Sequence, residues 1–436
     1  MANRRTFILA SSLVAASALT SACSGSNTAG GTSSGGGQKA TVVFWQFNTD
    51  EPTKTYWTKT IAAFESANPN ITVDMQIVPW SDQTAKLTTA IATGKTPDVS
   101  MMGNDVVAQY VAQDRLVALD DYMAEWSKES GTDITKDFVP GDLLYYKING
   151  HIYAAPLADE TRCVWYNTDV FKKAGIDAAS IKTWADMRTA AETIKSKVPG
   201  IVPWLAPMSK DYETVQTFMS VYLGYGARML NDQGACGFDT PEFKDALTYW
   251  TNLYLDGLST PDAVTYKGND LAGLLMSGQG AMMIHGPSVT ALVKGQAAEG
   301  KLGVIGIPAG PAGQFGFLGG WPLIVWKGQS EAAAAKFVHY ATSGAPLKEL
   351  LLVSGSLPPL KSMQNEAPWN TEPLATFAAG MNHAYPYQYP AQEIPQMGDI
   401  ETETIQNAVQ RVATKQATVE ESTKQLVQEI NSKLGK

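Results

Sequence analysis

The first feature of this sequence that could do chemistry is a set of charged side chains between two apolar runs. Asp159, Glu160 and Arg162 lie between an extended run that we expect to end at Pro156 and the apolar run 163–166. The second run is apolar without alternation, which predicts a fully buried strand. Charges so close to buried strands predict a segment that crosses an open cleft, where carboxylates accept strong hydrogen bonds from a bound molecule. A solvated loop is the alternative.

Two further polar clusters directly follow predicted strands. Residues 46–51 follow the apolar run 41–45, and residues 103–105 follow the run 97–102. In an open α/β sheet, ligands bind outside the carboxyl ends of the strands. These positions make candidate ligand-binding residues of Trp45, Gln46, Asn104 and Asp105. The alternatives are that Trp45 simply ends a buried strand and that Asp105 is the N-cap of a helix.

The elements that must position these residues follow from hydrophobic periodicity. A helix is predicted where Trp57, Ile61 and Phe64 recur at helical spacing, and a strand where apolar residues alternate over 71–77. A second helix carries Leu87 and Ile91, is capped by Ser81 or Asp82, and ends at Gly94. The order strand–helix–strand–helix–strand predicts an α/β fold with a parallel sheet. Further on, Asn149-Gly150 predicts a hairpin turn.

Length and charge narrow the class of protein. A chain of 436 residues is too long for one hydrophobic core and predicts two or more domains. Its 33 Lys and Arg residues are outnumbered by 42 Asp and Glu residues, which gives a net charge of −9. This balance argues against a nucleic acid partner. The histidines are scattered without metal-ligand spacing, so neither a metal nor a cofactor is predicted.

The N-terminal residues predict export and a lipid anchor. Residues 1–22 have the charged end, apolar run and small residues of a signal peptide, and Arg4-Arg5 leaves both the twin-arginine and the general route open. Cys23 lies where a lipoprotein carries its lipidated cysteine. Residues 23–39 then form a Gly- and Ser-rich flexible tether. Of the remaining cysteines, Cys163 and Cys236 form either a disulfide or separate buried thiols.

Several short motifs in a fixed order resemble one known family. The motifs are Thr93-Gly94-Lys95-Thr96-Pro97-Asp98-Val99, Leu116-Val117-Ala118-Leu119-Asp120, Asn149-Gly150 to Pro156, Trp165-Tyr166-Asn167-Thr168-Asp169, Thr183-Trp184, Gly280-Ala281-Met282, Gly286-Pro287 and Ile394-Pro395-Gln396-Met397. From about residue 40 to the end, this pattern resembles the extracellular solute-binding proteins of bacterial ABC sugar importers, the family of the maltose-binding protein.

The resemblance implies two α/β lobes joined by hinge crossings, with a carbohydrate bound between them. The first lobe would comprise residues 40–157 and about 307–345, and the second residues 158–306 and about 346–436. The protein would be a lipid-anchored monomer on the extracellular face of the membrane. It would deliver the carbohydrate to the permease subunits of an ABC importer and would not be an enzyme.

The resemblance also carries site residues over to this chain. Asn104 and Asp105 match positions where the family presents hydrogen-bonding groups, and Glu160 matches a sugar-binding hinge acid. Ser288 and Glu401 stand where the maltose-binding protein has tryptophan platforms, so a maltodextrin ligand does not follow. The predicted ligand-binding residues are Trp45, Gln46, Asn104, Asp105, Glu160, Tyr225, His285, Gly320 and Trp321.

Alternatives remain open for single residues and for the function. Glu160 could instead form a hinge ion pair with Arg162, and Trp321, which follows two glycines, could be a core residue rather than a stacking platform. Other members of the fold bind glycerol-3-phosphate, but a phosphate calls for Lys or Arg, and the candidate residues are mostly acidic or neutral. A neutral or cationic sugar is therefore preferred. A secreted glycoside hydrolase would use Glu160 and Asp105 as its carboxylate pair.

Overall fold

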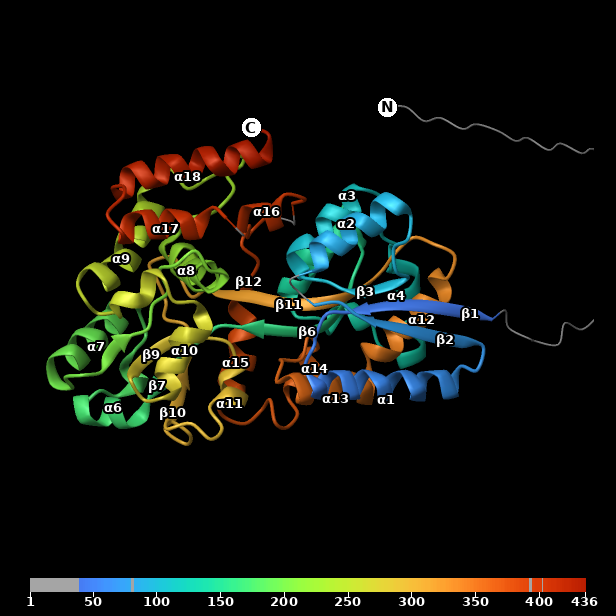
Figure 1. Ribbon diagram of the computed structural model, residues 1–436, viewed down its shortest axis with the longest axis horizontal. Helices are drawn as coiled ribbons and strands as arrows, with labels where there is room; N and C mark the ends of the chain where they lie inside the picture. Colours follow the sequence, from blue (N-terminus) through green and yellow to red (C-terminus); the bar gives the residue numbers. More distant parts are fainter. Residues whose placement is uncertain (1–38, 80–81, 392–393, 402) are drawn as a thin grey trace, which may run out of the picture. The chain divides into compact units, whose positions relative to one another are not determined.

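The computed structural model describes residues 39–79, 82–391, 394–401 and 403–436 (Figure 1). The predicted signal peptide, the lipidation site Cys23, the tether up to residue 38 and the candidate cap Ser81 lie outside the described residues. Among the residues that are described, no helix is both long enough and apolar enough to cross a membrane.

The larger sheet is built from the predicted N-terminal elements. Its strands lie in the order β12-β11-β3-β1-β2, and β6 pairs with β11 off this path. The strands are β1 (Ala40–Gln46), β2 (Ile71–Ile77), β3 (Val99–Met101), β6 (Ala155–Thr161), β11 (Gly316–Val325) and β12 (Ala384–Tyr385). Strand β1 pairs in parallel with both β2 and β3, as the alternation of strands and helices predicted. Strand β11 runs antiparallel to β3 and β6.

The helices around this sheet begin and end for local reasons. In α1 (Glu51–Ala67), the side chain of Asp50 accepts a hydrogen bond from the Thr53 amide, and Trp57 and Phe64 are buried. The α2 helix (Gln83–Thr93) ends at Gly94, whose φ of 64° is the left-handed conformation that glycine adopts without strain. Asp82 precedes α2, but its side chain makes no capping hydrogen bond.

Further helices and a short hairpin complete the part of the protein around this sheet. They are α3 (Val107–Ala112), α4 (Asp120–Ser130), α5 (Pro140–Tyr146), α12 (Glu331–Ala341), α13 (Gly344–Ser354), α14 (Lys361–Gln364) and the hairpin of β4 (Lys147–Ile148) and β5 (His151–Ile152). The predicted turn joins β4 to β5, with φ of 52° at Asn149 and 89° at Gly150. Phe44 of β1 lies edge-on to Trp57 of α1 and Phe337 of α12, so these two helices pack on β1.

The prediction that Pro156 ends the first extended run was wrong. Pro156 lies inside β6, which continues through Glu160 to Thr161. It is opposite Pro322 of β11, where the register of the two strands shifts. Neither proline has an N–H to donate. The shift in pairing therefore breaks no ladder hydrogen bond donated by Pro156 or Pro322. The alternative of a solvated loop over 159–162 was also wrong, because Asp159 and Arg162 are buried.

A second, smaller sheet follows directly after β6. Its strands β10 (Leu302–Ile305), β7 (Cys163–Asn167), β9 (Gly280–His285) and β8 (Val202–Trp204) lie in that order. The apolar run that begins at Cys163 forms β7, as predicted, and β7 pairs antiparallel with both β9 and β10. The chain therefore passes from one sheet into the other between Thr161 and Cys163, within two residues of Glu160.

The remaining helices belong mostly to the second half of the chain. They are α6 (Thr168–Ala174), α7 (Trp184–Lys197), α8 (Tyr212–Tyr225), α9 (Pro241–Leu255), α10 (Gly268–Met276), α11 (Val289–Leu292), α15 (Leu374–Gly380), α16 (Met397–Glu401), α17 (Ile405–Ala413) and α18 (Val419–Leu434). The sequence predicts capping boxes from Thr183 with Asp186 and from Thr418 with Glu421, and both are present at the starts of α7 and α18.

Packing in the core bears on the lobe boundaries. Leu347, Leu350 and Leu351 of α13 pack in the same hydrophobic cluster as β1 and β3, and the Tyr56 hydroxyl of α1 donates to the Pro346 carbonyl at 2.9 Å. Because α13 packs on α1, we propose that the first lobe continues past the predicted crossing near Ala345. The division into lobes as a whole stays a prediction.

The structure decides between the two alternatives for the cysteines. Cys163 and Cys236 are both free thiols and both buried. Burial raises the pKa of Cys163 above its ordinary value and raises the pKa of Cys236 to about 11. Both side chains therefore stay protonated and act as small apolar residues of the core.

Candidate ligand-binding site

A polar cavity of about 510 Å³ lies against β11 and the end of β6. Its lining comes from segments far apart in the sequence. The lining residues are Gln83, Gly103, Asn104, Asp105, Val106, Gln109, Glu160, Tyr212, Gln216, Phe317, Gly319, Gly320, Trp321, Gly398 and Asp399. The volume is in the range of a small-molecule site, and the lining combines carboxylates, amides and aromatic rings.

Glycines of β11 make room for the carboxylate that the sequence singled out. Gly319 is paired with Glu160 across β11 and β6, and Gly320 is paired with Asp159. A Cβ on Gly319 would lie 2.8 Å from Glu160 Oε1, and a Cβ on Gly320 would lie 2.6 Å from the Ala158 carbonyl oxygen. Only glycine lets the two strands approach so closely here, which places the Glu160 side chain at the cavity wall.

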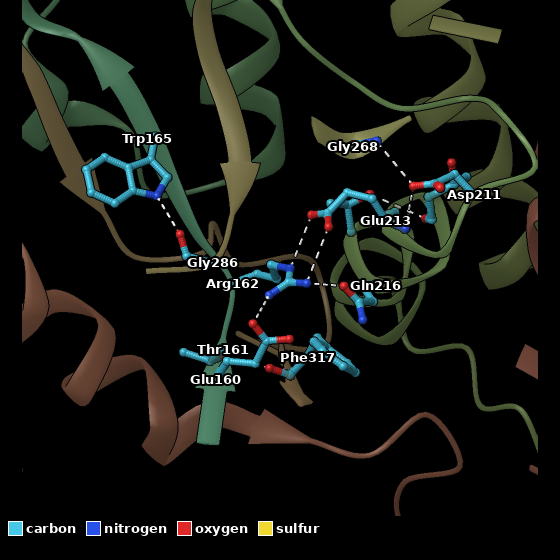
Figure 2. A network of polar contacts seen from close by, with 12 residues as sticks. Glu160, Thr161, Arg162, Trp165, Asp211, Glu213, Gln216, Gly268, Gly286 and Phe317 are labelled. Carbon is cyan, nitrogen blue, oxygen red and sulfur yellow. Dashed lines mark hydrogen bonds and ion pairs between the residues drawn. The ribbon is translucent and has the colours of Figure 1, made fainter. Parts of the chain in front are cut away.

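A buried arginine holds Glu160 in place (Figure 2). Arg162 Nη1 lies 3.0 Å from Glu160 Oε2, and the side chains are 5% and 25% exposed respectively. On its other edge the guanidinium binds both carboxylate oxygens of Glu213, with Nε at 3.2 Å from Oε1 and Nη2 at 3.3 Å from Oε2. Arg162 Nη2 also donates to Gln216 Oε1. The two predictions for Glu160, ligand contact and ion pair, are thus compatible in one geometry.

Two further acidic groups at or near the cavity, Asp105 and Glu401, are shielded from water. Asp105 lies in the 3₁₀ turn η2 (Asn104–Val106), whose N-cap is Gly103 rather than Asp105. Burial raises the pKa of Asp105, and a hydrogen bond with Glu401 opposes that rise. Glu401 is buried at the end of α16 and accepts a hydrogen bond from the Tyr212 hydroxyl. Asp105 is therefore free of the helix-capping role that was its alternative.

Two fully buried carboxyls lie close to the cavity, where Asp159 packs against the lining residue Gly320. Asp142 of α5 and Asp159 of β6 are in contact, and both are inaccessible to solvent. Burial raises the pKa of both groups well above the usual range, and the charge of Asp159 raises that of Asp142 further. The two carboxyls are best described as a pair that holds a proton between them. Sequence reasoning did not find this pair, because Asp142 lies in a helix with no polar neighbour to mark it.

The structure brings five of the predicted residues together at the cavity. They are Asn104, Asp105, Glu160, Gly320 and Trp321. The other four do not line it. Trp45 is buried with Lys86 Nζ 4.3 Å from its ring centroid, while the Gln46 side chain bonds the backbone of Asn48.

The last two predicted residues lie elsewhere for similar local reasons. Tyr225 ends α8 and packs on Tyr249, with ring centroids 5.9 Å apart. His285 is buried at the end of β9, opposite Cys163. Polar residues after β1 thus serve to begin α1, whereas those after β3 line the cavity. Ligand contacts for all nine residues remain a prediction.

Several lining residues were missed from sequence. Gln83, Gln109, Tyr212, Gln216 and Asp399 lie on four different helices and have no motif in common. The sequence held one signal for Tyr212. Asp211 is the N-cap of α8, so Tyr212 is the first residue of that helix. For the others, only the tertiary fold brings them to the cavity.

Trp321 provides a test of the aromatic wall. It lines the cavity while packing partly against the larger core. We expect Trp321→Ala to weaken ligand binding by about 1–3 kcal/mol, since a stacked indole buries a large apolar area. Trp326→Ala is the control: this ring is fully buried, so its loss should cost about 3–5 kcal/mol of stability. If Trp321→Ala lowers the melting temperature as much as Trp326→Ala and leaves affinity unchanged, Trp321 is a core residue.

The two sheets and their helices define a class of fold, the two-lobe α/β proteins. Comparison with solved structures agrees. The sugar-binding protein MalE from Xanthomonas citri has a TM-score of 0.79 at 24% identity, covering 91% of this chain and 97% of that one. An ABC transporter solute-binding protein from Thermotoga lettingae, bound with α-D-tagatose, has a TM-score of 0.76 at 24% identity, covering 91% of this chain and 100% of that one. Such similarity confirms the predicted two-lobe fold.

The chain belongs to the family of bacterial extracellular solute-binding proteins, whose model matches residues 48–345. The predicted family resemblance is therefore confirmed. A protein of Brucella abortus (strain 2308) named as a binding protein is 32% identical over 264 residues, which is 61% of this chain. The matched region spans 62% of the length of that relative.

Proposed function

We propose that the protein captures a carbohydrate in this cavity and delivers it to the permease subunits of an ABC importer. The observation that carries the proposal is the lining itself: Glu160 and Asp105 offer carboxylates to hydroxyl groups, and Trp321 and Phe317 offer aromatic faces to C–H surfaces. Carboxylates accept strong hydrogen bonds from hydroxyls, and rings bury apolar area without losing much conformational freedom.

The charge of the cavity weighs against a phosphorylated ligand such as glycerol-3-phosphate. Asp105, Glu160 and Asp399 all line the cavity, and among the described lining residues none is Lys or Arg. The nearest guanidinium, Arg162, is already bound by two carboxylates. Placing a phosphate among three carboxylates without a free cation costs electrostatic free energy, so we favour a neutral or cationic carbohydrate.

A thermal-shift screen against a carbohydrate library tests the function. A ligand present at 100 times its Kd adds about 2.7 kcal/mol to the free energy of unfolding, which gives a measurable rise in melting temperature. We propose binding without catalysis, so the carbohydrate should be recovered unchanged after incubation with the protein. A library in which no carbohydrate shifts the melting temperature, while glycerol-3-phosphate does, would reverse the choice of ligand.

We also propose that the protein is exported and anchored by a lipid on Cys23, as a monomer on the extracellular face of the membrane. If so, Cys23→Ala should release the protein from membranes into the soluble fraction, because residues 24–38 are a Ser- and Gly-rich tether. Fractionation followed by immunoblotting measures this. Finding the wild-type protein mainly in the soluble fraction would contradict the lipid anchor.

A further inference from the structure

The contacts of Arg162 fix which way the Gln216 side chain points. A guanidinium has only donors, so the atom of Gln216 that it binds must be the carbonyl oxygen Oε1. The amide nitrogen Nε2 is then on the other side of the side chain, as Figure 2 shows. Gln216 lines the cavity, and Nε2 has no partner among the described residues. Arg162 therefore turns a hydrogen-bond donor toward the cavity.

The same arginine orients the neighbouring Glu160 carboxylate so that it presents a hydrogen-bond acceptor to the cavity, where Gln216 presents a donor. Arg162 Nη1 binds Oε2 of Glu160, which leaves Oε1 as an acceptor at the cavity wall beside Gly319. Because Nη1 and Nη2 belong to one planar guanidinium, Arg162 fixes the orientation of the Glu160 and Gln216 side chains relative to one another. Glu213 binds the far edge of the guanidinium and keeps that plane from rotating.

Two glycines, Gly286 directly after β9 and Gly319 in β11, leave space for the side chains of Arg162 and Glu160. A Cβ on Gly286 would lie 2.8 Å from Arg162 Nη1, and a Cβ on Gly319 would lie 2.8 Å from Glu160 Oε1. The ring of Phe317, which also lines the cavity, lies under the guanidinium with its centroid 5.3 Å from the Arg162 central carbon. The guanidinium and the Glu160 carboxylate are therefore packed closely against Gly286, Gly319 and the Phe317 ring.

We propose that Arg162 is a positioning residue that sets Glu160 and Gln216 as an acceptor–donor pair for two adjacent hydroxyl groups of the ligand. One hydroxyl donates to Glu160 Oε1, and its neighbour accepts from Gln216 Nε2. The inference rests on the proposed carbohydrate function and sharpens it: the ligand has an unsubstituted pair of neighbouring hydroxyls. It also assigns Gln216, which no sequence motif marks, as a specificity-determining residue.

The test is a cycle of protein variants and ligand variants. The tightest-binding carbohydrate of the screen and its monodeoxy analogues are titrated calorimetrically into wild-type protein and Gln216→Ala. For wild-type protein we expect two adjacent positions at which deoxygenation weakens binding. Gln216→Ala should weaken binding of the parent carbohydrate by about 3- to 10-fold, the usual range for one neutral hydrogen bond. It should bind one of the two deoxy analogues as tightly as wild-type protein does.

Two further variants separate positioning from stability. Gln410→Ala is the matched control, because this helical glutamine donates to the Val264 carbonyl at 2.8 Å and does not line the cavity; its affinity should equal that of wild-type protein. Arg162→Lys keeps the charge but cannot hold two partners in one plane, so discrimination between the parent and both deoxy analogues should fall. A loss of stability alone would leave that discrimination intact.

The result that overturns the inference is a Gln216→Ala variant that binds the parent like wild-type protein, or that is weakened equally toward the parent and every deoxy analogue. Either would show that Nε2 does not read a particular hydroxyl. Failure of the proposed function looks different, because then no carbohydrate binds the wild-type protein at all, and the inference falls with it.

Discussion

Replacing Glu160 with glutamine is expected to weaken carbohydrate binding by about 1.5–3 kcal/mol, or about 10- to 150-fold in Kd. The substitution keeps the shape of the side chain and removes the charge that strengthens its hydrogen bond to a hydroxyl. Because Arg162 also loses one of its two carboxylate partners, the free protein should be slightly less stable. That loss should be smaller than the 3–5 kcal/mol of a fully buried broken pair, since the Glu160 side chain is 25% exposed.

Glu213→Gln is the matched control for this experiment. Glu213 binds the same guanidinium from the other side, and it is not among the residues that line the cavity. Its substitution should lower the melting temperature at least as much as Glu160→Gln while raising Kd less, because Glu213 acts on the ligand only indirectly, through Arg162. Equal effects of the two variants on Kd would mean that Glu160 acts only through Arg162 and does not touch the ligand.

Replacing Asp142 with asparagine is expected to stabilise the free protein at pH 7 by about 1–3 kcal/mol, the cost of a poorly satisfied buried polar group. Asp142 and Asp159 are buried together, and asparagine would donate a hydrogen bond to Asp159 without adding a second acid. The measurement is urea unfolding of wild-type protein and variant from pH 4 to pH 8.

The direction of the pH dependence follows from the raised pKa values. A carboxyl with a raised pKa in the folded state binds a proton more tightly there than in the unfolded chain, where its pKa is about 3.9. The contribution of the pair to stability is therefore present at acidic pH and is lost as the pH rises through the folded-state pKa. Asp142→Asn should flatten this decline. An unchanged slope together with lower stability at pH 7 would contradict the shared proton.

Asp186→Asn supplies a control of opposite sign. Hydrogen bonds from the Thr183 side chain and from the backbone lower the pKa of Asp186 in the capping box of α7. The contribution of this carboxylate to stability is present above the unfolded pKa and is lost as the pH falls. Its substitution should therefore lower stability at pH 7 more than at pH 4, whereas Asp142→Asn should raise stability at pH 7.

Local sequence was sufficient for the N-terminal elements β1, α1, β2, α2 and β3 and for the starts of some later helices. Alternation identified β2, helical spacing identified α1 through Trp57 and Phe64, and the capping boxes at Thr183 and Thr418 marked the first turns of α7 and α18. These signals are local because each depends on backbone groups only a few residues apart. The error at Pro156 came from the same locality: whether a proline interrupts a strand depends on its partner, and Pro322 lies 166 positions further along the chain.

Trp321 was predicted from the two glycines before it, and the polar residues of the predicted site came from positions at or near the end of a strand. Asn104 and Asp105 after β3, and Glu160 near the end of β6, were found in this way and do line the cavity. Trp45 and Gln46 follow the same rule at β1 and do not, because Gln46 folds back onto the Asn48 backbone. Sequence alone does not show which strand end faces a cavity and which begins a helix.

The sequence by itself determined the family and the α/β class, since these depend on motifs and periodicity. Only the tertiary structure decided that Gln216 of α8 and Glu160 of β6 meet at one guanidinium, and that Asp142 of α5 meets Asp159 close to the cavity. The physical reason is that a buried charge must find its partner wherever the fold places one, and contacts between distant segments leave no local pattern in the chain.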